Sequence, residues 1–206
     1  MVDNIDTMLK LLKKGGRPLT SFKKGDTIRV SNHMEKTSYI LSKDPGKDFD
    51  PRFKPYATPG EILALGAFGG KYLNDCIEEF PAEWFLNALA LNTLRLEKQD
   101  ISVNYFKIDS RLPLSEWKKR GWVPGGPIQG ILSDPKKNPD IRGWFQWYCR
   151  YWMGRRLPEL DDIQIRRWLA FVRHSGAIKK ACTPGDLTCR PRQRQALLHW
   201  AWDFTI

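Results

Sequence analysis

Hydrophobic and polar positions follow a helical period at the start of the chain and a strand period soon after. Residues 4–14, NIDTMLKLLKK, are amphipathic and predict a short helix, which Gly15 and Gly16 are expected to end in a left-handed cap. The β-rich runs DTIRV and TSYIL flank the polar stretch SNHMEK and predict a β-hairpin. Residues 43–57 contain three prolines and lack an apolar period, so we expect an extended connector.

The middle of the chain combines helix signals with helix breakers. TPGE at 58–61 is a capping-box pattern, and the GAFGG that comes after it breaks the helix. KYLNDCIEE at 71–79 predicts one or two helical turns, and PAEWFLNALAL predicts a helix begun by Pro81. ISVNYFKI at 101–108 is typical of a strand and LSEWKKRG of a short helix, while SDPKKNPD at 133–140 is a candidate boundary.

The last third of the chain predicts three helices, at about 140–153, 161–181 and 191–203. The expected fold is therefore mainly α with a small N-terminal β-hairpin (α+β), and with a compact C-terminal helical bundle. We divide the chain into residues 1–57, holding the first helix, the hairpin and the connector, and residues 58–206, a mainly helical domain.

The sequence GWFQWYCRYWMGRR at 143–156 concentrates aromatic side chains on one helix. At 100° per residue its six aromatic residues occupy an arc about 160° wide, which is typical of a core-facing helix. Gln146, Arg150 and Met153 fall on the other side. Arg155 falls within the aromatic arc, where it can lie over Tyr148 or Tyr151 and keep donors for a phosphate or a carboxylate.

Charge changes this picture, because the net charge of +11 is unevenly distributed. Residues 141–206 hold 12 Lys and Arg against 5 Asp and Glu, a balance of +7, whereas residues 1–140 hold 22 against 18. Such an asymmetry favours a polyanionic partner. The alternative is a basic surface that serves solubility.

The helix expected at 161–181 places basic residues on one face and apolar residues on another. Arg166, Arg173 and Lys180 recur every seven residues, as do Arg167 and His174, and we see no acidic i, i+4 partners for them. The apolar stripe expected in the core consists of Ile165, Trp168, Leu169 and Val172. A solvated helix face is the ordinary interpretation of the basic ridge; contact with phosphates is the functional one.

Arg190, Arg192 and Arg194 crowd the start of the last helix, where the helix dipole disfavours cations. Backbone N–H groups and arginines there would suit a phosphate. Alternatively, Asp186, Glu159 or the C-terminal carboxylate neutralises these arginines.

Two carboxylates are weak candidates for acid–base chemistry. Asp75 and Glu79 would share one helix face at i, i+4, although Lys71 stands i, i+4 to Asp75 and a surface or salt-bridge role is commoner. The chain contains no P-loop, GxGxxG, HExxH or GxSxG motif, which removes the enzyme classes that carry them.

The four cysteines are Cys76, Cys149, Cys182 and Cys189. The chain has no apolar signal-peptide core and no long apolar run, so we expect reduced thiols and an intracellular protein of the cytoplasm or nucleus/nucleoid, without a membrane partner. Cys182 and Cys189, with two histidines nearby, do not match the ligand spacing of zinc sites, so no metal or cofactor is expected.

The blocks FGGKYLNDCIEEFPAEWF, GWFQWYCRYWMGRR and CRPRQRQALLHWAWD together resemble an uncharacterised group of predicted proteins. The resemblance spans about residues 55–203 and implies no activity. From the residues alone, the leading hypothesis is a nucleic-acid-binding protein, DNA favoured. Its expected phosphate contacts are Arg155, Arg156, Arg166, Arg173, Arg190, Arg192 and Arg194.

Two alternatives stay open. One is an enzyme that acts on a nucleotide or a nucleic-acid base, with an aromatic and arginine pocket and with Asp75 or Glu79 as its acid–base group. The other is a basic module that binds an acidic protein. The sequence leaves the oligomeric state and the choice between DNA and RNA undecided.

Overall fold

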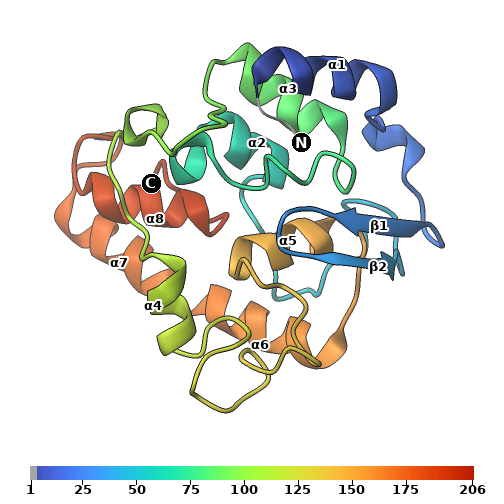
Figure 1. The fold of residues 1–206 in the computed structure, drawn as a ribbon. Helices are drawn as coiled ribbons and strands as arrows, with labels where there is room; N and C mark the ends of the chain where they lie inside the picture. The colour runs from blue at the N-terminus through green and yellow to red at the C-terminus, as the bar shows by residue number, and fades with distance from the viewer. Residues whose placement is uncertain (1–3) are drawn as a thin grey trace.

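A computed structural model describes residues 4–206 (Figure 1). Its first two helices begin at residues whose side chains cap them. Helix α1 (Ile5–Gly15) begins at Asn4, whose side chain accepts the N–H of Thr7 at 2.8 Å. Helix α2 (Pro59–Ala64) has the complete capping box between Thr58 and Glu61, and helix α3 (Ala82–Ala90) follows Pro81. α3 packs against both α1 and α2.

The predicted hairpin is present and supplies the small β component of the fold. Strands β1 (Thr27–Ser31) and β2 (Lys36–Ile40) pair antiparallel, with Thr27 opposite Ile40 and Ser31 opposite Lys36. Ile28 and Val30 of β1 are buried, while the hairpin lies beside helix α5 (Trp144–Trp152) in Figure 1. The mainly α fold with an N-terminal hairpin is therefore confirmed.

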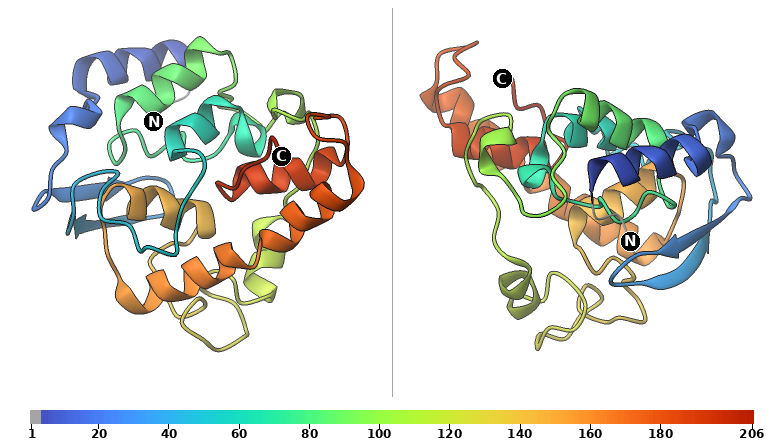
Figure 2. Two further views of the ribbon diagram at one scale, coloured as in Figure 1. Left: turned by 180° about the vertical axis from the view of Figure 1, so that it is seen from behind. Right: turned by 45° about the horizontal axis from the view of Figure 1, so that its top comes forward.

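The C-terminal part is helical, but it divides differently from the prediction. It consists of α4 (Leu114–Lys119), α5, α6 (Pro158–Leu169), α7 (Val172–Ala181) and α8 (Pro191–His199). The helix expected at 161–181 is two helices, separated at Ala170 and Phe171. Because of this break Leu169 and Val172 are exposed, so the predicted apolar stripe is wrong at these two positions. α7 and α8 pack side by side (Figures 1 and 2).

Residues 71–79 form turns instead of the expected helix. Leu73 takes a left-handed conformation with φ of 61°, and the Asn74 side chain donates to the carbonyl of Gly70 at 2.8 Å. The backbone before this segment is also engaged elsewhere, since the Gly70 carbonyl accepts the N–H of Arg95 at 2.8 Å. These longer-range bonds compete with a local helix.

Residues 101–108 form a 3₁₀ turn, η3 (Ile101–Val103), and further turns instead of the expected strand. The Asp100 carboxylate accepts the N–H of Ser102 at 2.9 Å, and the Asn104 side chain donates to the carbonyl of Ile108 at 2.9 Å. Side chains that bond to the nearby backbone favour turns over an extended strand.

Gly16 also differs from the prediction, because it caps α1 in an extended conformation, with φ of −67° and ψ of 129°. Its N–H donates to the carbonyl of Leu12 at 2.9 Å. A Cβ atom at Gly16 would clash with the carbonyl oxygen of Leu12 and lie 2.8 Å from the Cβ of Ala82, so the end of α1 and the close approach of α3 together explain the glycine.

The segments before and after residue 57 share one hydrophobic core built around α5. Phe53, from the extended connector, contacts the rings of Trp144, Trp147 and Trp168 at centroid distances of 4.9–6.4 Å. The prediction that the aromatic arc of α5 forms core is confirmed. The opposite side of α5 is buried as well, including Arg150.

Cys182 and Cys189 form a disulfide, so the expectation of free thiols at these positions is wrong. The cysteines therefore no longer support the expected intracellular location. Cys76 and Cys149 are free and buried. Within residues 4–206 no helix is long and apolar enough to cross a membrane. The same residues contain no cluster of His, Cys, Asp and Glu side chains that could hold a metal.

Candidate functional site: an aromatic and basic cavity

Arg155 is part of the buried core and not of a phosphate site. Its Nη1 and Nη2 donate to the two carboxylate oxygens of Asp140 at 2.9 and 2.5 Å, and the side chain is almost fully buried. Its guanidinium lies over the ring of Tyr39, at 5.8 Å, and not over the tyrosines of α5. The carboxylate that Arg155 contacts is therefore one of the protein's own, and its burial does not support this arginine as a ligand contact.

Two further arginines donate hydrogen bonds to backbone carbonyls of the protein. Arg156 lies 3.9 Å from the ring centroid of Tyr151 and donates to the carbonyls of Tyr151 and Lys47. Arg194 is fully buried and donates to the carbonyls of Asp186, Cys189 and Phe204 at 2.8–2.9 Å. Neither a phosphate nor a carboxylate is needed to satisfy them, so both are removed from the predicted contact set.

The other predicted arginines lie on the surface. Arg166 pairs with Asp162 at 2.8 Å, an i, i+4 partner that the sequence interpretation overlooked. Arg192 is exposed and donates through Nε to the carbonyl of Asp109 at 3.2 Å, and Arg190 is exposed at the start of α8. Arg173 is exposed on α7 and forms no ion pair with any residue in 4–206.

Asp75 and Glu79 are held in separate ion pairs, and the segment between them is not a helix. Although partial burial raises it, the pKa of Asp75 is held below its usual value by Arg142, which donates to both carboxylate oxygens at 2.7 Å. Glu79 is buried, which raises its pKa, and accepts the Arg150 Nε at 2.6 Å. Neither residue lines the cavity described next, so the structure gives no support to them as acid–base groups.

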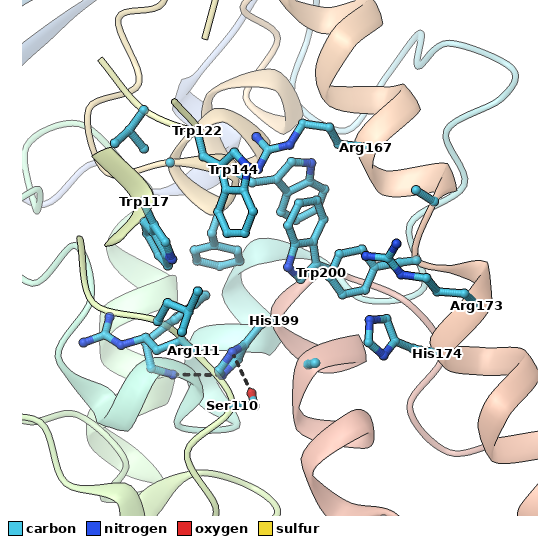
Figure 3. A pocket seen from close by; sticks show the side chains of 18 residues that line it. Ser110, Arg111, Trp117, Trp122, Trp144, Arg167, Arg173, His174, His199 and Trp200 are labelled. Carbon is cyan, nitrogen blue, oxygen red and sulfur yellow. Dashed lines mark hydrogen bonds between the residues drawn. The ribbon is translucent and has the colours of Figure 1, made fainter. Parts of the chain in front are cut away.

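A cavity of about 370 Å³ lies where α4, α5, α7 and α8 approach the segments around Phe68 and Ser110 (Figure 3). Its walls combine aromatic rings with cationic side chains. The aromatic members are Phe68, Trp117, Trp122, Trp144, Phe145, Phe171 and Trp200. The basic members are Arg111, Arg167, Arg173, His174 and His199. Among the described residues no aspartate or glutamate lines it.

Two central rings of the wall each lie between two other rings. Phe68 lies between Tyr72 and His199, at centroid distances of 4.5 and 4.1 Å. Trp200 lies between Trp144 and Phe171, at 4.5 and 4.1 Å. These rings therefore form a rigid floor and offer edges to a ligand.

Trp117 and Trp122 differ from that floor, because within residues 4–206 no aromatic ring stacks on them. Trp122 has the guanidinium groups of Arg120 and Arg167 near its ring, at 5.2 and 5.8 Å. Trp117 has no cationic partner of this kind in the described part of the chain. It belongs to α4, a helix with no buried residue.

No carboxylate of residues 4–206 lines the cavity to balance the charge of its basic side chains. Arg167 donates to the side-chain oxygen of Gln164 at 2.7 Å, and burial alone lowers its pKa to about 10. Burial, then the charge of Arg111, lowers the pKa of His199 to about 3, so this ring is neutral near pH 7. Burial, then the charge of Arg173, also lowers the pKa of His174. An anion in the cavity would relieve this accumulation of positive charge.

The hydrogen bonds around His199 fix where its proton lies. The Gln195 Oε1 accepts the N–H of Phe106 at 3.0 Å, which turns the Gln195 amide nitrogen toward the His199 Nε2 at 2.9 Å. The N–H of Phe68 donates to the same Nε2 at 3.3 Å. Two donors point at Nε2, so the proton of the neutral ring is on Nδ1.

The Nδ1–H of His199 therefore donates to Ser110 Oγ, 3.3 Å away. His199 in this tautomer cannot accept the proton of Ser110, so the pair is not a nucleophile with its general base. The Ser110 hydroxyl instead keeps its own hydrogen for a ligand.

Of the wall residues, the sequence singled out Arg173 as a phosphate contact and Arg167 with His174 as a basic ridge, and it assigned the rings of α5 to the core. It did not point to Ser110, Arg111, Trp117 or Trp122. The missed residues lie between 100 and 142, where the sequence predicts only short elements and does not show which side chains meet. Comparisons of the chain with protein-family models, curated proteins and solved structures find no match.

Proposed function

We propose that the protein binds nucleic acid at the cavity and along the basic surface beside it, with DNA as the first ligand to test. The observation that carries the proposal is the composition of the cavity wall: aromatic rings and cations, with no carboxylate from residues 4–206. Aromatic rings suit bases and arginines suit phosphates, and the two together are typical of sites that bind single strands.

The surface next to the cavity extends the positive charge. Arg173, Lys179 and Lys180 are exposed on α7, and Arg190 and Arg192 are exposed at the start of α8, which packs against α7. These residues are the revised phosphate contacts. Arg155, Arg156 and Arg194 leave the set because the fold itself uses their donors. Arg166 leaves it because Asp162 pairs with its charge.

The salt dependence of binding tests the proposal. Fluorescence anisotropy with labelled single-stranded DNA, RNA and duplex DNA is measured over a range of salt concentrations. Binding is expected to weaken steeply with salt, and Arg173→Gln is expected to reduce the slope of log K against log salt by about 1. Arg29→Gln, which removes one charge from the exposed face of β1, is the matched control and should leave the slope nearly unchanged.

A triple replacement of Arg190, Arg192 and Arg194 would confound this test, because Arg194 is buried and holds the C-terminal segment. The double variant Arg190→Gln with Arg192→Gln is the informative one. Heparin at matched salt separates nucleic-acid binding from general attraction between charges, since a basic module for acidic partners would bind all the polyanions alike. Absence of nucleic-acid binding at low salt would contradict the proposal.

A further inference from the structure

We propose that the cavity receives one unpaired nucleotide of a single strand, with its base stacked on Trp117 and its phosphates beside Arg111 and Arg173. This inference rests on the proposed nucleic-acid binding and specifies which part of the ligand the cavity holds.

Trp117 is the ring best placed to stack on a base. The other tryptophans of the wall are covered by rings or by guanidinium groups, whereas Trp117 has neither partner within residues 4–206. One side of its indole is supported by Gly143, where an added Cβ would lie 3.2 Å from the ring. The half-buried indole of Trp117 lines the cavity (Figure 3), as does Gly143.

The cavity suits an unpaired base. Its volume of about 370 Å³ falls in the range of about 300–1,000 Å³ that is usual for small-molecule sites. A base within a duplex has both faces stacked and its pairing edge occupied, so it cannot lie on Trp117 without leaving the helix. A single strand offers the same base at a lower cost.

The polar side chains of the wall select for hydrogen-bond acceptors on the ligand. Ser110 keeps a hydroxyl hydrogen because His199 donates to its oxygen, and the guanidinium groups can only donate. Carbonyl oxygens and ring nitrogens of a base are acceptors of this kind, and so are phosphate oxygens. Arg111 and Arg173 both line the cavity, and in Figure 3 they lie on opposite sides of Trp200, so a strand in the cavity would meet both cations.

The test uses the full chain and a short single strand that is abasic except for one 2-aminopurine, whose fluorescence falls when its ring stacks on an aromatic side chain. Quenching is expected on binding by the unaltered protein. Trp117→Ala should weaken binding by about tenfold or more and abolish the quenching, while Trp117→Phe should retain much of both. Ser110→Ala should weaken binding about two- to tenfold. Ser115→Ala, on the exposed side of α4, is the matched control and should change neither quantity.

The outcomes separate this inference from the function on which it rests. Salt-dependent binding that is equally tight in Trp117→Ala would overturn the cavity site and leave nucleic-acid binding intact. Tighter binding of the fully paired duplex than of the strand would also overturn it. Failure to bind any oligonucleotide at low salt would overturn both the cavity site for a strand and the proposed nucleic-acid binding. In that case the binding of AMP is measured by titration. Binding of AMP that depends on Trp117 would assign the cavity to free nucleotides instead of a strand.

Discussion

Arg150 holds a buried positive charge against carboxylates from three separate parts of the chain. Its guanidinium donates to Glu79 at 2.6 Å, to Asp140 at 3.0 Å and to Glu35 at 3.1 Å. The arginine and two of its partners are almost completely buried. Because burial of a charge is costly, these groups are stable only as a set.

Replacing Arg150 with methionine should therefore destabilise the protein. Arg150→Met keeps much of the side-chain volume but leaves buried carboxylates without their cation, so we expect the free energy of unfolding to fall by about 3–5 kcal/mol. Denaturation by urea measures it. Arg52→Met, which breaks exposed pairs with Asp50 and Asp162, is the control and should destabilise the protein far less. An equal effect of both substitutions would contradict this account of the network.

At the scale of elements, the sequence predicts those whose signals are local. Thr58 with Glu61 caps α2, and the amphipathic period of residues 4–14 gives α1. Segments governed by distant partners are not predictable in this way. Residues 71–79 have a helix-like composition, yet Asn74 and the Gly70 backbone bond to Arg95, more than twenty residues away. The burial of Arg150 also needs the hairpin, whose Glu35 covers the far side of α5.

Helix α7 contains an exposed glycine whose replacement by alanine is expected to stabilise the protein. A Cβ at Gly176 would meet no atom within 4 Å, so Gly176→Ala should raise the free energy of unfolding by about 0.5–1 kcal/mol, since alanine loses less backbone entropy in a helix. Gly60→Ala in α2 is the comparison. There the added Cβ would lie 2.6 Å from the Trp84 ring, and the substitution should destabilise the protein. Thermal unfolding of both variants distinguishes the signs, and stabilisation by Gly60→Ala would be the contradictory result.

For the whole molecule, charge asymmetry points to a region of the chain but does not tell which of its charges are free and which the core uses. The excess of arginine after residue 140 includes Arg173 at the cavity, yet it also includes Arg155 and Arg194, whose charges the core uses. No sequence pattern separates these uses, because burial depends on where segments far apart meet. The cavity itself forms where α4 and the segment around Ser110 close over α5 and α8, a contact that no local period encodes.

His199 joins the end of α8 to the Phe68 turn and to Ser110, and it makes the stability of the whole molecule depend on pH. Its pKa in the folded protein is lowered to about 3 by burial and by Arg111, against about 6.5 in the unfolded chain. A lowered folded-state pKa gives stability that is complete above the unfolded value and is lost as the pH falls. Between pH 7 and pH 5 this residue should remove about 2 kcal/mol from the free energy of unfolding.

The variant His199→Gln isolates this contribution, because every other titrating group is common to the two proteins. The difference in unfolding free energy between the unaltered protein and the variant should shrink by about 2 kcal/mol from pH 7 to pH 5, and should stay constant from pH 7.5 to pH 9, where the histidine is neutral in both states. Urea denaturation at each pH gives these values. Parallel curves across the acidic range would show that the pKa of His199 is the same in the folded protein as in the unfolded chain. The folded protein would then also protonate this ring below about pH 6.5, and a further positive charge would face the cavity only at acidic pH.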